Sequence, residues 1–72
     1  MKKTGSHHWF VQIERYDTGR VLAAIVRDKQ LVKRPANIRK RQVGRIVTGQ
    51  WVNSRYKAEA LVAYAKGSEE AA

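Results

Sequence analysis

A strand-like alternation that runs into a glycine turn is the feature that most limits how this chain can fold. Between residues 8 and 16, apolar side chains at every second position alternate with more polar ones, which is typical of a half-buried strand. The sequence Asp17-Thr18-Gly19 follows, and a three-residue connection of this kind ends on a glycine in the left-handed conformation. Residues 20–28 then return as a second strand that is apolar on both faces. The pattern predicts an antiparallel β-hairpin over residues 8–28.

The length of the turn also sets a register for this hairpin. If the first residue after the turn faces the last residue before it, the predicted cross-strand pairs are Tyr16–Arg20, Ile13–Ala23, Val11–Ile25 and Trp9–Arg27. The last of these pairs would let a guanidinium group stack on an indole ring.

The size of the chain predicts one small domain. Seventy-two residues are near the lower limit for a self-sufficient apolar core, and without Cys neither a disulfide nor a Cys-based zinc site can reinforce it. We expect a flexible lead-in over residues 1–7, a single basic domain over residues 8–67 and a frayed acidic tail over residues 68–72. No apolar run is long enough to span a membrane, so a cytoplasmic protein is expected.

Two further elements are expected after the hairpin. Pro35 suits the first turn of a helix, and residues 36–48 place one apolar stripe opposite their basic side chains, so we predict a basic helix there that ends at Gly49. A strand over residues 43–52 is the rival interpretation. A second helix is predicted over residues 54–66, capped by Asn53 or Ser54.

The fold class expected from these elements is α+β. It consists of an N-terminal β-hairpin followed by two helices, with the second helix packed over the Trp9, Val11 and Ile13 face of the hairpin. The rival is a three-stranded antiparallel sheet with a C-terminal helix.

Positive charge is concentrated in the middle of the chain. Residues 27–57 hold ten of the fifteen Lys and Arg residues and a single acid, Asp28, so this segment carries the whole formal charge of +9. Such a field attracts polyanions, and arginine can contact phosphate or a guanine edge through two parallel bonds. We therefore expect a nucleic-acid-binding protein, with duplex DNA favoured. The expected contact residues are Arg27, Lys33, Arg34, Arg39, Lys40, Arg41, Arg45, Arg55 and Lys57.

A helix over residues 36–48 would also divide these contact residues into those that read bases and those that hold phosphates. Arg41 and Arg45, one helical turn apart, would face the bases of a major groove, while their neighbours would hold phosphates. A helix-turn-helix motif is not expected, because a turn at either Gly44 or Gly49 puts a long basic side chain where the motif needs a small residue.

Other partners are compatible with the same charge. The basic patch could dock on an acidic or nucleic-acid-binding surface of a host enzyme, which would make the protein an inhibitor or adaptor, or it could bind RNA. A short, basic, Cys-free chain of this kind is typical of small regulators and accessory factors of phages and mobile elements. A homodimer is also plausible, because residues 20–28 are apolar on both faces and Ala60 and Ala63 form a small-residue side on the last helix.

Catalysis and cofactor binding are not expected. The only histidines, His7 and His8, are adjacent and would point to opposite sides of an extended chain, with no third metal ligand close in sequence. There is no Cys nucleophile, and the six acids are not spaced as an acid–base pair. We expect no enzymatic activity, no metal and no cofactor.

Overall fold

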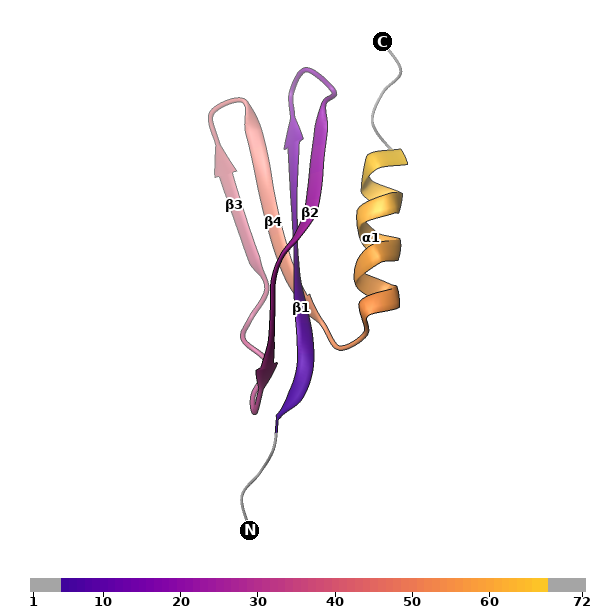
Figure 1. The fold of residues 1–72 in the computed structure, drawn as a ribbon. Coiled ribbons are helices and arrows are strands. Elements are labelled where there is room, and N and C mark those ends of the chain that lie inside the picture. The colour runs from indigo at the N-terminus through magenta and orange to yellow at the C-terminus, as the bar shows by residue number, and fades with distance from the viewer. Residues whose placement is uncertain (1–4, 68–72) are drawn as a thin grey trace.

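A computed structural model describes residues 5–67 of the protein as one antiparallel sheet covered on one face by a helix (Figure 1). The predicted acidic tail and most of the predicted lead-in lie outside these residues. The elements in chain order are β1 (Ser6–Tyr16), β2 (Val21–Leu31), β3 (Ile38–Gln42), β4 (Arg45–Val52) and α1 (Arg55–Gly67). The strand order across the sheet is β2-β1-β4-β3, so β1 and β4 are central and β2 and β3 are the edges.

The predicted fold class is wrong. No helix forms over residues 36–48, where the chain makes the antiparallel pair β3 and β4 instead. The three-stranded alternative is also wrong: its strand over residues 43–52 overlaps β4, but residues 5–67 form a sheet of four strands. The physical reason is that β3 is a short, fully exposed edge strand, which has no apolar alternation to reveal it.

The predicted hairpin pairing is confirmed near its turn. The amide of Tyr16 donates to the carbonyl of Arg20 at 2.8 Å, and Gly19 takes the expected left-handed φ of 93°. The pairs Ile13–Ala23 and Val11–Ile25 are both present. The Trp9–Arg27 pair is wrong, because an irregularity between Phe10 and Val11 shifts the register by one residue. Phe10 therefore faces Arg27, and Trp9 faces Asp28.

A two-residue turn joins β3 to β4. Gln42 pairs with Arg45, and between them Gly44 adopts a φ of 79°, a value that L side chains rarely take. The carbonyl of Gly44 accepts a hydrogen bond of 3.0 Å from the amide of Asp17. The turns of the two hairpins therefore lie together at one end of the sheet.

The C-terminal helix packs as predicted on the hairpin. Ser54 is its N-cap: the Ser54 hydroxyl accepts from the amide of Lys57 at 3.3 Å. Ala65 of α1 is fully buried in a core cluster with Val21 and Ala23 of β2, against which Ile13 and Val62 pack. In residues 5–67 no helix has both the length and the apolar character needed to cross a membrane.

The face of the sheet opposite α1, here called the open face, carries its own small aromatic cluster. Phe10 of β1 and Trp51 of β4 are cross-strand partners whose ring centroids are 5.0 Å apart, and each is only 7% exposed. The Phe10 ring lies directly over Gly49, where an added Cβ would come within 2.2 Å of the ring. Gly49 is thus an interior residue of β4 and does not end an element as predicted. Its lack of a side chain makes room for Phe10.

Candidate nucleic-acid interface

An uninterrupted exposed segment leads from the end of β2 into β3. Every residue from 32 to 43 is exposed, and the sequence holds no acid between Asp28 and Glu59. Five cations of this segment form a surface that we call the basic edge: Lys33, Arg34, Arg39, Lys40 and Arg41. Arg39, Lys40 and Arg41 belong to β3, the edge strand farthest from β2, whereas Lys33 and Arg34 lie in the connection that leads from the end of β2 to β3 (Figure 1).

The strand geometry of β3 spreads its cations to both sides of the edge. Arg39 and Arg41 pair with Thr48 and Ile46, on the face that carries α1, whereas Lys40 pairs with Val47 on the open face. Successive side chains of a strand point to opposite faces, so these three adjacent basic side chains lie on both faces of the edge and not in one row. An anion that approaches the edge meets positive charge on both flanks.

The basic edge is not neutralised by the protein's own carboxylates. Within residues 5–67 the carboxylates that contact a basic side chain are Asp28, 3.5 Å from His7, Glu14, 2.8 Å from Arg45, and Glu59, 3.5 Å from Arg55. None of these pairs involves a residue of the basic edge. Its five charges therefore face solvent without a counter-charge from this part of the chain.

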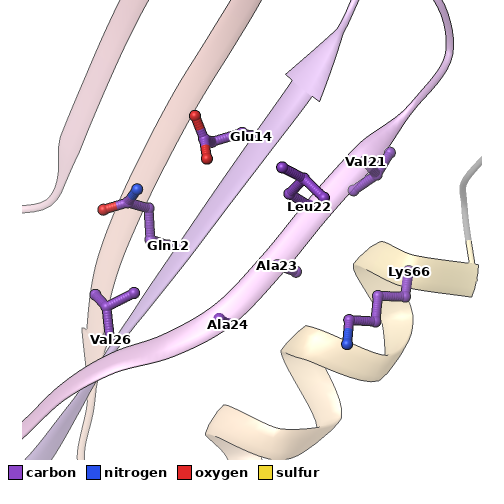
Figure 2. A pocket seen from close by; sticks show the side chains of 8 residues that line it. All are labelled: Gln12, Glu14, Val21, Leu22, Ala23, Ala24, Val26 and Lys66. Atoms are coloured by element: carbon purple, nitrogen blue, oxygen red, sulfur yellow. The ribbon is translucent and has the colours of Figure 1, made fainter.

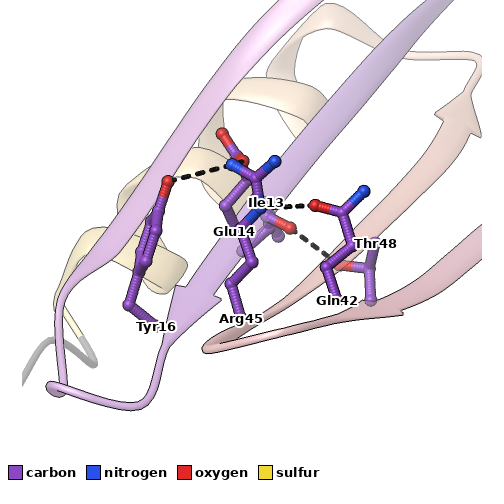
Figure 3. A network of polar contacts seen from close by, with 6 residues as sticks. All are labelled: Ile13, Glu14, Tyr16, Gln42, Arg45 and Thr48. Atoms are coloured by element: carbon purple, nitrogen blue, oxygen red, sulfur yellow. Dashed lines mark hydrogen bonds and ion pairs between the residues drawn. The ribbon is translucent and has the colours of Figure 1, made fainter.

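Arg45, by contrast, is held in a polar network on the open face (Figure 3). Its guanidinium donates to Glu14 at 2.8 Å, to Gln42 at 2.6 Å and to the Tyr16 hydroxyl at 3.3 Å. The hydrogen bond to Tyr16 is the largest effect on the pKa of Arg45 and raises it; burial acts in the opposite direction, and the charge of Glu14 raises it further, so that the pKa lies above its ordinary value. The Arg45 guanidinium is therefore already bound by side chains of the same chain.

This placement corrects the predicted base-reading pair. Arg41 and Arg45 are not one helical turn apart, because residues 36–48 are not helical. Arg41 pairs with Ile46 on the face that carries α1, while Arg45 lies on the open face beside Tyr16. The two guanidinium groups thus leave the sheet on opposite sides.

Arg27 extends the positive surface across the open face. Arg27 and Lys29 of β2 line a cavity of about 590 Å³ whose walls include Phe10, Trp51 and Ile38. The Lys29 ammonium lies over the Trp51 ring, 5.8 Å from its centroid. Lys29 is absent from the predicted contact set, although it belongs to the same basic run of the sequence.

The remaining two predicted contact residues, Arg55 and Lys57, are on α1. The helix contacts β1, β2 and β4, and within residues 5–67 it makes no contact with β3. Arg55 also pairs with Glu59 one turn along the helix. The structure therefore does not bring Arg55 and Lys57 together with the basic edge.

The aromatic side chains are not placed to stack on unpaired bases at this surface. Residues 32–43 contain no aromatic residue, and the nearby Phe10 and Trp51 are buried. Tyr56 and Tyr64 are well exposed, but both are on α1. What the basic edge offers is charge and hydrogen-bond donors.

Residues 5–67 contain no group of three or more His, Asp or Glu side chains that could hold a metal ion. His7 lies beside Asp28, and the Nδ1 atom of His8, a buried residue of β1, is 2.7 Å from the carbonyl of Ser6. Both histidines thus have partners within the sheet.

The chain matches no protein-family model, and no curated protein and no solved structure is similar to it. The candidate interface therefore rests on its own geometry and charge.

Proposed function

We propose that this protein is a non-enzymatic nucleic-acid-binding protein that binds duplex DNA through the basic edge, as a small regulator or accessory factor. The observation that carries the proposal is the set of five exposed cations in an acid-free segment, none of them paired with a carboxylate of residues 5–67. Like charges held together destabilise a small fold unless a counter-charge is present, and a phosphate backbone supplies one.

The shape of the edge supports a duplex over a single strand. A two-stranded β-ribbon fits the B-DNA major groove, which is about 12 Å wide. The hairpin of β3 and β4 forms one side of the four-stranded sheet, and within residues 5–67 its β3 side is free while β4 is paired to β1. The alternation of Arg39, Lys40 and Arg41 places cations on both faces of this free edge, so an edge that enters a groove would carry charge toward both phosphate walls. Recognition of single strands depends on exposed aromatic platforms, which the basic edge lacks.

The test is a titration of fluorescently labelled duplex DNA, single-stranded DNA and RNA by fluorescence anisotropy at several salt concentrations. Five phosphate contacts predict a log–log salt slope of about −4.5 on duplex DNA. The triple variant Arg39→Ala, Lys40→Ala, Arg41→Ala removes three of these contacts, so its slope should be less steep by about 2.7.

A matched control separates the effect of the basic edge from that of total net charge. The triple variant Arg20→Ala, Lys57→Ala, Lys66→Ala also removes three exposed bases, but from the hairpin turn and α1 rather than the basic edge. Its slope should stay within about 1 of the unmodified protein, which reflects only the loss of long-range attraction. Equal effects of the two triple variants would show that binding follows bulk charge and not the basic edge.

The other two partners give different results in the same experiments. Tighter binding to single strands or RNA than to duplex, with quenched Trp fluorescence, would identify an RNA-binding protein. A slope near zero on every nucleic acid would overturn the proposal. A pull-down partner that survives nuclease treatment would then identify the protein-directed inhibitor or adaptor.

A further inference from the structure

The two edges of the sheet are chemically opposite. The β3 edge carries Arg39, Lys40 and Arg41, whereas residues 21–26 of the β2 edge read Val-Leu-Ala-Ala-Ile-Val. All fifteen bases and all six acids of the chain lie outside residues 21–26. Edge strands of soluble proteins are normally protected by charge, proline or a bulge. Here the register irregularity comes only after Ile25, so residues 21–25 form a regular, unprotected edge.

The backbone of this edge is ready to pair with another strand. In an antiparallel ladder, residues alternate between those that bond to the neighbouring strand and those whose amide and carbonyl point away from it. The Tyr16–Arg20 hydrogen bond fixes that alternation for β2. It places the outward-pointing groups on Val21, Ala23 and Ile25, where residues 5–67 supply no further strand.

The first half of β2 carries apolar side chains on both faces of the sheet. Val21 and Ala23 are buried under α1, while Leu22 and Val26 remain 42% and 48% exposed on the other side. These exposed apolar side chains flank the outward-pointing backbone groups, so a strand added at this edge would meet apolar side chains on both faces. A cavity of about 390 Å³ runs along this strand, lined by Val21 to Ala24 and Val26, by Gln12 and Glu14 of β1, and by Lys66 of α1 (Figure 2).

We infer that the β2 edge pairs with the β2 edge of a second copy of this chain. The two strands would run antiparallel about a two-fold axis at Ala23, which joins two four-stranded sheets into one of eight strands. In this register Ala23 faces Ala23, Val21 faces Ile25 and Leu22 faces Ala24 of the second copy. Every pair is apolar, and the outward backbone groups of both strands are satisfied together.

Among the possible contacts between two copies of this chain, charge favours the β2 edge. Each chain carries +9, so two copies repel wherever their basic surfaces meet, whereas residues 21–26 of β2 carry no charge, and Glu14 and Lys66, which line the cavity beside them, have opposite charges. Pairing at β2 also keeps the two β3 strands, with Arg39, Lys40 and Arg41, on the outer sides of the joined sheet.

The position of α1 fits this arrangement. The helix packs over β1 and β2, so the two-fold axis would place both copies of α1 on the same face of the joined sheet. Helices centred between β1 and β2 would be roughly two strand spacings apart, about 10 Å, which is within the range of packed helices. The helices therefore permit the edge contact.

The test is sedimentation equilibrium of the full chain without nucleic acid, from micromolar to millimolar concentration. The mass should rise from 8.2 kDa toward twice that value. The variant Leu22→Lys, Val26→Lys puts charge on exposed positions of the β2 edge and should weaken dimerisation at least tenfold. Its matched control is Val43→Lys, Tyr64→Lys, which adds the same charge at exposed positions of the β3–β4 turn and α1 and should leave the dimer nearly intact.

Disulfide cross-linking tests the same interface without introducing charge, in case the lysine variant folds poorly. The chain has no Cys, so Leu22→Cys, Ala24→Cys introduces the only thiols, at positions that face each other across the proposed interface. Facing residues of an antiparallel pair are within disulfide reach, and mild oxidation should give a covalent dimer. Val43→Cys is the control and should cross-link far less. A monomer at all concentrations, or equal cross-linking of both variants, would overturn the inference.

Discussion

The contact between Gly49 and Phe10 gives the sharpest test of the fold. In the variant Gly49→Ala, the new Cβ would come within 2.2 Å of the Phe10 ring, so the ring must move away from Trp51. Overpacking of this kind costs about 1–3 kcal/mol. Gly49 does not have a positive φ, so alanine strains no backbone there and restores about 0.5 kcal/mol by restricting the unfolded chain. An approach of 2.2 Å is far inside van der Waals contact, so the cost should lie in the upper part of this range, and we expect a net loss of about 2 kcal/mol.

That loss is large for a domain of this size. A chain of 72 residues has a free energy of unfolding of roughly 4–11 kcal/mol, and each kcal/mol shifts Tm by roughly 4–8 °C. Thermal and urea unfolding followed by circular dichroism should therefore show a fall in Tm of roughly 8–16 °C for Gly49→Ala. The control Gly67→Ala meets no described atom within 4 Å and should change stability by less than about 0.5 kcal/mol.

A double-mutant cycle separates the clash from other causes. Phe10→Leu removes the ring atoms that the new Cβ would meet, so Gly49→Ala in that background should cost less than about 0.5 kcal/mol. If Gly49→Ala costs the same about 2 kcal/mol with and without the Phe10 ring, close packing of the ring on Gly49 is not the reason for the glycine, and the reasoning is refuted.

The other predictions concern single contacts. Ser54→Ala should destabilise the protein by about 1 kcal/mol in urea unfolding while Ser54→Asp should not, and equal losses would contradict the capping role. Gly44→Ala should cost about 1 kcal/mol because of its φ of 79°, and an unchanged urea midpoint would argue against this turn geometry. In the anisotropy titration, Arg41→Ala should weaken duplex binding more than Arg45→Ala, because Arg45 is engaged by Glu14; the reverse order would remove Arg41 from the interface. Glu14→Gln should release Arg45 and make the salt slope steeper by about 0.9, whereas an unchanged slope would show that Arg45 stays out of reach of phosphate.

The part of the fold that the sequence predicts well is local. Asp17-Thr18-Gly19 specifies its turn through one glycine, and the register that follows is correct as far as Val11 and Ile25. It fails at Phe10, where the register shifts by one residue, because no glycine or proline in the sequence marks that irregularity. The N-cap at Ser54 and the packing of α1 on the hairpin are likewise found from local signals.

The middle of the chain could not be predicted from periodicity, because an edge strand with cations on both sides has none. Residues 38–42 are exposed throughout, so their pattern matches the polar side of a helix as well as a strand. Two signals in the sequence did favour strands: the β-branched residues of 43–52, and Gly44 and Gly49, which both weaken a helix. The ion pair of Arg45 with Glu14, 31 positions away, is a tertiary contact that no local pattern reveals.

The unlike edges of the sheet would also limit the self-association that we propose. Pairing through β2 is head-to-head, so once two copies have joined, each of the outermost strands is a β3. Both outer strands then present Arg39-Lys40-Arg41, and two such strands cannot approach without repulsion. An exposed apolar strand that could otherwise begin a growing fibre would then be limited to a closed pair, and the cations that we propose bind DNA would also oppose polymerisation.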